Sequence, residues 1–241
     1  MVTSIESGHS ANRATDGHVD HLALVRLLQL ASAASPVGSF ALSEALEYAV
    51  FRGAVHDEAS ARDWIGGLLR HATCALDVPL LIGMHAAWVG GRIDAALGTS
   101  AWLLACRESA ELRSGDRRQA QALLRILDGA GMVTARTLLS DRRVGYACAF
   151  ALAASNLGIA ASSAGVAFAY AWLENVTMAA VRLVPLGQYA GQRMLLDLGA
   201  CIPELCSSAY GLDPDDIAAG APGQAVASAL HEIQHTRIYL S

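Results

Sequence analysis

The clearest chemical pattern in the sequence lies near its end, where residues 231–235 read HEIQH. Two histidines one helical turn apart can hold zinc, and a glutamate between them can act as general base, as in zinc peptidases. A catalytic zinc needs a third protein ligand, which in such peptidases follows the second histidine. The segment TRIYLS after His235 contains no Cys, His, Asp or Glu. A zinc-dependent hydrolase is therefore kept as the alternative, and we predict no catalytic residue and no metal ligand.

The same segment predicts an amphipathic helix whose histidines lie on its outer face. On a helical wheel, Val226, Leu230 and Ile233 share one side, and His231 and His235 lie nearly opposite. We expect the apolar side to pack on the core. The two histidines should then face solvent or a partner protein.

Two charged pairs elsewhere have spacings that are typical of solvated helices. Glu44 and Glu47 lie one turn apart at an expected helix start, where the helix dipole favours negative charge. Arg107 and Glu111 have the i, i+4 spacing of an exposed ion pair. Both patterns predict exposure to solvent.

Motifs and charge exclude several classes of ligand. Neither GxxxxGK[ST] nor GxGxxG occurs, so we expect no nucleotide binding by this chain. The net charge of −5 provides no basic surface for nucleic acid. The five cysteines form no CxxC pair, which favours reduced thiols and a cytoplasmic protein.

The apolar content exceeds what one globule of 241 residues usually needs. Hydrophobic residues make up 54%, charged residues 16%, and the mean hydropathy is +0.36. The surplus predicts an oligomer interface, partner proteins or a membrane. The uncharged run 144–173 is long enough to span a bilayer, but it is rich in alanine and interrupted by Ser155 and Asn156. We therefore expect two buried helices there, forming the molecular centre or a dimer seam, and no membrane.

Helical periodicity extends along most of the chain. It predicts an all-α protein with one domain, a bundle of about ten helices over residues 21–241, after a disordered leader, residues 1–20. Asp57 and Asp77 are expected to cap helix N-termini. Trp102 and Trp172 are expected to pack in the core.

Four segments, in order, resemble the urease accessory protein F (UreF) family. In that family a first helix leads into a Pro-Val-Gly turn, and a central pair of helices carries Cys-Arg-Glu and Glu-Leu-Arg. Further on, a helix enters a Pro-x-Gly-Gln turn, and the terminal helix carries His-Glu. The segments are LLQLASAASPVGSFALSEALEYAV (27–50), LLACRESAELRSGDRRQAQALLRIL (103–127), AWLENVTMAAVRLVPLGQYAGQ (171–192) and ASALHEIQHTRIYLS (227–241). The chain departs from the pattern at Ser39, where the family often has glycine, and at His235, where an aromatic residue is more usual.

The resemblance implies an all-α, dimeric, non-catalytic adaptor of urease maturation. Members of this family bridge the accessory protein D (called H in some species) and the GTPase accessory protein G, and the complex docks on apo-urease. Nickel and GTP are then handled by the complex, and this chain itself binds no cofactor.

The resemblance also suggests which residues contact partners. The terminal helix and tail would dock on the D protein, and the turn 185–188 with Arg182 would shape the surface for the G protein, supported by Arg107 and Glu108. The predicted partner-binding residues are Pro36, Gly38, Glu44, Glu47, Arg107, Glu108, Arg182, Pro185, Gly187, Gln188, His231, Glu232, Arg237 and Tyr239.

Overall fold

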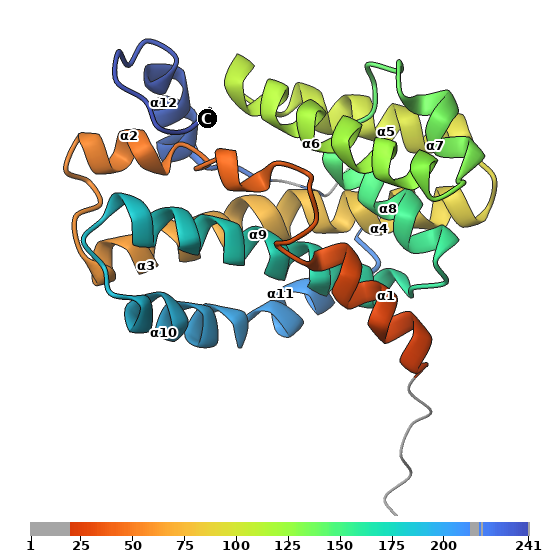
Figure 1. Ribbon diagram of the computed structural model, residues 1–241, viewed down its shortest axis with the longest axis horizontal. Helices are drawn as coiled ribbons and strands as arrows, with labels where there is room; N and C mark the ends of the chain where they lie inside the picture. Colours follow the sequence, from red (N-terminus) through yellow and green to blue (C-terminus); the bar gives the residue numbers. More distant parts are fainter. Residues whose placement is uncertain (1–19, 213–216, 218, 241) are drawn as a thin grey trace, which may run out of the picture.

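A computed structural model describes residues 20–212, 217 and 219–240 (Figure 1). In chain order its elements are α1 (His21–Ala31), the 3₁₀ helix η1 (Ser39–Ala41), α2 (Leu46–Phe51), α3 (Glu58–Leu68), the π-helical segment η2 (Leu69–Asp77), α4 (Val78–Val89), α5 (Ile93–Ala105), α6 (Ala110–Gly129), α7 (Val133–Leu138), α8 (Tyr146–Asn156), α9 (Ala161–Leu183), α10 (Gln188–Gly199), α11 (Ile202–Ser208) and α12 (Pro222–His231). The described residues contain no strand. The predicted all-α fold is confirmed, and short helices such as α2 and α7 add to the expected ten or so.

The predicted leader, residues 1–20, lies outside the described residues except for Asp20. That side chain accepts hydrogen bonds from the backbone N–H groups of Leu22 and Ala23, and so caps α1. The predicted cap at Asp57 is also confirmed. Its carboxylate accepts from the backbone of Ser60, whose side chain bonds back to Asp57 as a capping box.

The centre of the molecule is α8, which packs against α4, α6 and α9 (Figure 1). Each residue of the run 147–154 is buried. Alanine side chains let the neighbouring helices approach closely, and Phe150 and Phe168 fill the remaining space with rings 5.4 Å apart, edge to face. The Ala-rich run is therefore the molecular centre, and α8 offers no free face for a dimer seam.

Two helical stretches have the length and hydropathy of a membrane span, Glu58–Val89 and Ala161–Leu183. In their most apolar windows 67% and 56% of the residues are buried inside the molecule. The first stretch joins α3, η2 and α4 into one continuous helix. The apolar side chains of both stretches are used mainly for the core of the bundle.

The continuous helix corrects the prediction that Asp77 caps a helix start. Asp77 lies inside the stretch and makes no side-chain capping bond. Its carboxylate is buried and pairs with Arg107, 2.7 Å away. A second correction concerns Trp102, which is 45% exposed, whereas Trp172 packs against the core as expected.

Candidate protein-interaction site

The C-terminal segment is fastened to the molecule by Glu47 of α2. One carboxylate oxygen accepts a hydrogen bond from the backbone N–H of Ile238 at 2.7 Å, and the other accepts from the backbone N–H of Tyr239 at 2.9 Å. The second oxygen also lies 3.1 Å from Nε2 of His231. Glu47 itself is buried. The predicted exposure of this glutamate is therefore wrong: it serves as an anchor for the tail, residues 232–240.

His231 is enclosed between two carboxylates. Its Nδ1 lies 2.6 Å from Glu111 on α6, opposite the contact of Nε2 with Glu47, and the ring is 0% exposed. An imidazole can donate to both carboxylates only when both nitrogens carry hydrogen. Glu111 also accepts a hydrogen bond from Arg237. The predicted Arg107–Glu111 surface pair is wrong, because Glu111 is committed to the C-terminal segment.

Glu232 completes the connection to α6. Its carboxylate accepts from the backbone N–H groups of Ala110 and Glu111, at 2.8 and 3.2 Å. These are free donors in the first turn of α6, where the helix dipole favours negative charge. We call Glu47, Glu111, His231, Glu232 and Arg237 the tail junction. It joins α2, α6 and the tail through groups far apart in the sequence.

The junction turns polar groups inward and leaves apolar side chains outside. Val226, Leu230 and Ile233, predicted to face the core, are 60%, 37% and 73% exposed. The prediction is wrong for these three residues and for His231, because His231 has two buried acceptors, which outweigh the burial of a few aliphatic groups. It is confirmed for His235, which is exposed. In the tail, Ile238 is 79% and Leu240 50% exposed.

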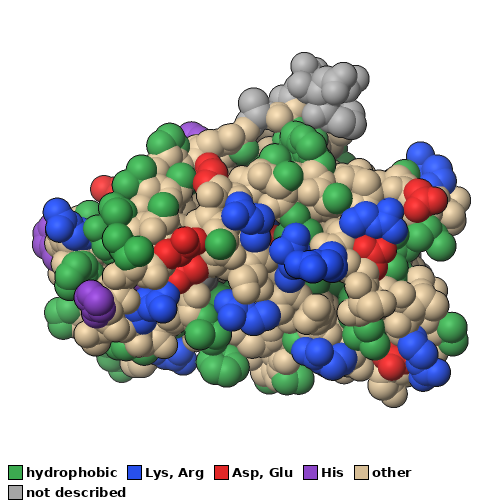
Figure 2. All heavy atoms as spheres, turned by 90° about the horizontal axis from the view of Figure 1, so that it is seen from above, with side chains coloured by type: hydrophobic (Ala, Val, Ile, Leu, Met, Phe, Trp, Pro, Cys, Tyr) green, Lys and Arg blue, Asp and Glu red, His purple; other side chains and the backbone are tan. Residues whose placement is uncertain are grey.

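A groove separates the tail from the first turns of α6. It has a volume of about 560 Å³. Its lining includes Ser114 and Arg118 of α6 on one side and Ile238 and Leu240 of the tail on the other. Figure 2 shows this side of the molecule, with hydrophobic side chains gathered at the end that carries α12 and arginines spread over the middle and the other end. The lining combines exposed apolar side chains with two arginines, Arg118 and Arg237, and two glutamates, Glu111 and Glu232. An apolar centre with a polar rim is typical of protein interfaces.

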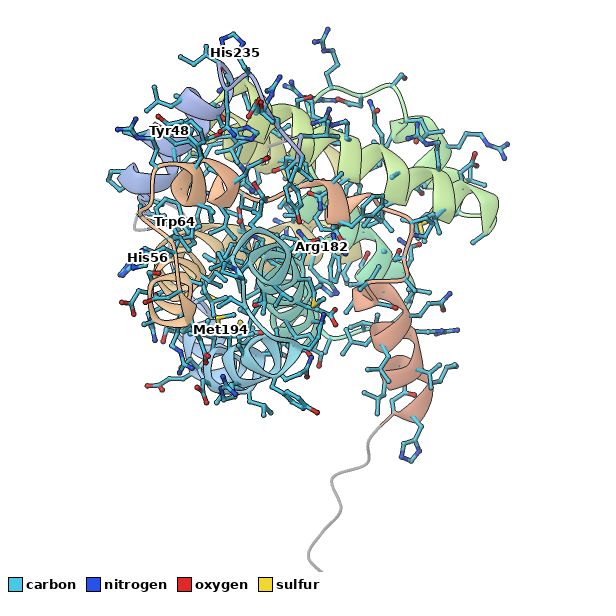
Figure 3. All side chains as sticks on the ribbon, turned by 60° about the vertical axis from the view of Figure 1, so that its left-hand side comes forward. Tyr48, His56, Trp64, Arg182, Met194 and His235 are labelled. Carbon is cyan, nitrogen blue, oxygen red and sulfur yellow. The ribbon has the colours of Figure 1, made fainter. Side chains whose placement is uncertain are left out.

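The spacing that a zinc peptidase needs is not formed. α12 ends at His231, so His235 does not follow one helical turn later on the same face. Both nitrogens of His231 face carboxylates, whereas His235 is exposed and points away at the edge of the molecule (Figure 3). Within the described part of the chain, no group of three or more His, Cys, Asp or Glu side chains is placed to hold a metal ion.

A buried charge cluster lies beneath the tail junction. The guanidinium of Arg107 is 2.7 Å from Asp77 and 3.0 Å from Asp116. Burial alone would lower the pKa of Arg107, but the two aspartates raise it above its usual value. Burial raises the pKa of Asp77, and the Arg107 charge opposes that shift. Arg107 is therefore an internal counter-ion, whereas its neighbour Glu108 is exposed.

Glu44 connects this cluster to α12. Its carboxylate accepts a hydrogen bond from Gln224 at 3.2 Å. Burial raises the pKa of the Glu44 carboxyl to about 7; the Arg107 charge lowers it, and the charges of Asp77 and Asp116 raise it. The predicted solvated helix start is wrong here too. With three carboxyl groups around one guanidinium, an ionised Glu44 adds a charge that the cluster does not balance.

The turn before Glu44 is held by side chains from distant helices. Gly38 has a φ of +80°, a conformation that glycine adopts without strain, and Pro36 beside it is exposed. Gln119 of α6 donates to the Ser39 hydroxyl at 2.7 Å, and Asn175 of α9 donates to the Leu42 carbonyl at 3.2 Å. The turn is thus placed by the bundle on the same side as the charge cluster.

The second predicted surface lies at the α9–α10 turn. Arg182, Pro185, Gly187 and Gln188 are all exposed, and Tyr189 is 84% exposed. Figure 1 places this turn at the same end of the molecule as α12, with α2 between them, and Figure 3 labels Arg182. Within the described residues, Arg107 is paired with Asp77 and Asp116, and no hydrogen bond or ion pair joins Arg107 or Glu108 to this turn, so the expected extension of the surface is not formed.

Asp77, Glu111 and Asp116 were missed as parts of these clusters. Glu111 fits an i, i+4 pair and Asp77 fits a helix cap. These local interpretations gave no indication of the long-range partners of either residue. Asp116 gave one signal, an acidic residue within the arginine-rich stretch RSGDRR. Tyr239 was named as a partner contact, but its side chain is 5% exposed.

Together these features define a helical scaffold with an anchored tail and outward-facing apolar groups. A sequence model of the UreF family matches residues 55–199. The urease accessory protein UreF of Alkalilimnicola ehrlichii is 40% identical over 220 residues, covering 91% of this chain and 96% of the relative. That of Azoarcus sp. is 42% identical over 226 residues, covering 91% and 96%. The urease accessory protein UreF 2 of Brucella anthropi is 38% identical over 224 residues, covering 93% and 99%. The chain belongs to the UreF family of urease accessory proteins, as its four segments predicted.

Proposed function

We propose that this protein is a non-catalytic adaptor of urease maturation that bridges accessory protein D (H) and the GTPase accessory protein G. In this proposal the complex docks on apo-urease and assembles its nickel centre in a GTP-dependent step, while this chain binds neither nickel nor GTP. The observation that carries the proposal is the tail junction, which fixes the tail with its apolar side chains directed outward. A rigid surface with exposed apolar groups and a polar rim is suited to holding another protein.

The D protein would occupy the groove between the tail and α6. Ile238 and Leu240 would enter an apolar site on that partner, and Arg118 of α6 would pair with an acidic residue beside that site. His231, Glu232, Arg237 and the backbone of Tyr239 would act by holding this surface in shape. Their polar groups are already engaged within the chain.

The G protein would bind the α9–α10 turn. Arg182, Gln188 and Tyr189 project from a turn whose geometry Pro185 and Gly187 set, and they supply a cation, an amide and an aromatic ring to a partner. Because α2 packs against both α12 and α9, one rigid element would connect the two docking surfaces.

The homodimer and the cytoplasmic location also belong to the proposal. α1 buries a single residue, Leu30, and exposes Leu22, Val25 and Leu28 at 57%, 61% and 63%. An apolar face of this kind suits a second copy of the chain. The adaptor would work without a membrane or nucleic acid, consistent with the net charge of −5.

Co-expression with the D and G proteins, followed by gel filtration, tests the proposal. Ile238→Asp places a charge on the proposed D surface without removing the backbone N–H that Glu47 accepts. Val133→Asp on α7 is the matched control, since Val133 is 71% exposed and lies outside both surfaces. We expect the three-protein complex with the wild type and with Val133→Asp, and loss of the D protein with Ile238→Asp. An intact complex with Ile238→Asp would exclude the groove as the D surface.

A further inference from the structure

The outer face of α6 carries a line of exposed polar side chains that the proposed function uses only at one end. The buried side chains of this helix lie on one face. At 3.6 residues per turn, positions 114, 118, 121 and 125 fall on the opposite face and extend over about 16 Å of the helix. We call the four exposed side chains at these positions the α6 stripe: Ser114, Arg118, Gln121 and Arg125.

The two cations of the stripe have no partner within the described part of the chain. Arg118 and Arg125 form no ion pair and no side-chain hydrogen bond there. Residues 112–127 contain four arginines and one aspartate, a net charge of +3, in a chain whose net charge is −5. The aspartate is Asp116, which is buried and paired with Arg107. The positive charge of the helix is therefore directed outward.

The surroundings of the stripe add one more free cation. Arg136 on α7 is neutralised by Asp128 at the end of α6, 2.8 Å away. Arg142, by contrast, is exposed and forms no ion pair among the described residues. Its carbonyl accepts a hydrogen bond from Nε of Arg117 at 3.3 Å, so its backbone lies against the side of α6. Figure 2 shows arginine side chains along the middle of this side of the molecule, where Figure 1 places α6.

The stripe is continuous with the groove beside the tail. Ser114 and Arg118 line that groove and also begin the stripe. The two glutamates of the groove, Glu111 and Glu232, are already engaged within the tail junction. They therefore leave Arg118 free to pair with a group from outside the chain. A protein seated on the exposed tail would meet the free cations of the stripe as it extends along α6.

The chemistry of the stripe selects carboxylates on a protein. The N–H groups of a guanidinium form a fork that matches the two oxygens of one carboxylate. Arg118 and Arg125 are two helical turns apart, so the occupant should place two carboxylates about 10 Å apart in one line. A nucleic acid fits this surface less well, because the net charge of −5 repels a polyanion. The apolar side chains of Ile238 and Leu240 at one end of the stripe also suit a protein.

We propose that the partner in the tail groove also lays an acidic strip of its surface along the α6 stripe. This inference rests on the proposed function, in which that partner is the D protein. The exposed arginines attract the acidic strip and fix the orientation of the partner, and the apolar tail then holds it. Opposite charges at the edge of an interface mainly raise the association rate, whereas buried apolar contacts slow dissociation. The stripe and the tail should therefore differ in their kinetic effects.

The kinetics of binding of the full chain to immobilised D protein test this proposal. Arg118→Glu/Arg125→Glu reverses the charge of the stripe. Arg70→Glu/Arg92→Glu is the matched control, because it changes the net charge equally at exposed sites outside the groove and the stripe. In about 50 mM salt the stripe variant should associate about tenfold more slowly than the wild type, and the control within about twofold of it. In about 500 mM salt the difference should fall to about twofold or less, because the charges are screened.

Equal association of the stripe variant and the wild type at low salt would overturn this proposal and leave the docking of the D protein intact. An equal loss in the control would also overturn it, because net charge alone would then explain the effect. A wild type that does not bind the D protein would overturn the proposed function as well.

Two further measurements secure the interpretation. A short duplex DNA serves as a second probe, and its binding to the wild type, lost in the stripe variant, would assign the stripe to nucleic acid instead. The thermal midpoint of the stripe variant should lie within about 2 °C of the wild type, because both side chains are exposed. If that variant does not fold, Arg125→Glu alone, outside the lining of the groove, should still slow association at low salt. An unchanged rate in that single variant would overturn the proposal.

Discussion

The tail junction and the α9–α10 turn lie at the same end of the molecule but are built in opposite ways. At the junction, two glutamates and a histidine are enclosed, and the outward surface is apolar. At the turn, Arg182, Gln188 and Tyr189 are exposed and the geometry comes from Pro185 and Gly187. Charged residues that look alike in the sequence can therefore have two roles. Some are enclosed and hold a surface in position, and others are exposed and are themselves part of the surface. Variants of the enclosed polar residues at the junction should therefore lower the stability of the fold. Variants at the turn should weaken only the recruitment of a partner protein.

The largest effect is expected at the anchor of the tail. Glu47→Gln keeps the size of the side chain but removes the charge that faces His231 and the backbone N–H groups of Ile238 and Tyr239. Gln offers one acceptor oxygen where Glu47 offers two, and each buried donor left without an acceptor costs about 1–3 kcal/mol, so the free energy of unfolding should fall by about 2–4 kcal/mol. Urea unfolding measures the change. Glu108→Gln, at an exposed site, is the control; an equal loss in both variants would contradict the assigned role of Glu47.

A dependence on pH is the second expectation, because Gln224 links Glu44 to α12. The pKa of Glu44 is about 7 in the folded state, above the ordinary value of 4.5, so the folded state binds the proton more tightly. The stability that this proton supplies is present at low pH and is lost as the pH rises from about 4.5 to 7. The loss is on the order of 3 kcal/mol. Glu44→Gln should flatten this part of the pH profile; the same slope in the variant would remove Glu44 as its cause.

A stabilising substitution should be available next to the junction. Ala45 has a φ of +67° at the start of α2, a left-handed conformation that costs an L-residue about 1–2 kcal/mol. Ala45→Gly relieves a strain of about 1–2 kcal/mol but loses about 0.8 kcal/mol from the buried methyl group, so the free energy of unfolding should rise by at most about 1 kcal/mol. Ala49→Gly, inside the same helix, should lower it by about 1 kcal/mol. Thermal unfolding of both variants measures the contrast, and a destabilised Ala45→Gly would show that the strain is smaller than the free energy of burying the methyl group.

The smallest effect on stability is expected at the turn. Arg182→Glu should change the free energy of unfolding by less than about 0.5 kcal/mol, because the side chain is exposed. Recruitment of the G protein should nevertheless weaken. In a co-purification experiment, the variant should lose the G protein and keep the D protein. Equal recruitment would remove Arg182 from the proposed surface, and a large loss of stability would erase the contrast between the regions.

Local sequence rules predicted the local structure well. The cap at Asp57, the break between α8 and α9 and the central position of the alanine run follow from capping chemistry, a Gly turn and side-chain size. The site was harder because its contacts are long-range. Glu47 and His231 are separated by 184 residues, and Asp77 and Arg107 by 30. No sequence periodicity relates the two members of such a pair. A helical wheel considers one helix alone, so it predicts an exposed histidine even where other helices supply buried acceptors.

The central claim is that the tail is already ordered in the free protein by the junction. Hydrogen exchange at the backbone N–H groups of Ile238 and Tyr239 tests it most directly, because Glu47 accepts both. Slow exchange in the isolated wild type, and fast exchange in Glu47→Gln with α8 still protected, is the predicted result. Exchange at the rate of an unstructured peptide in the wild type would contradict the account.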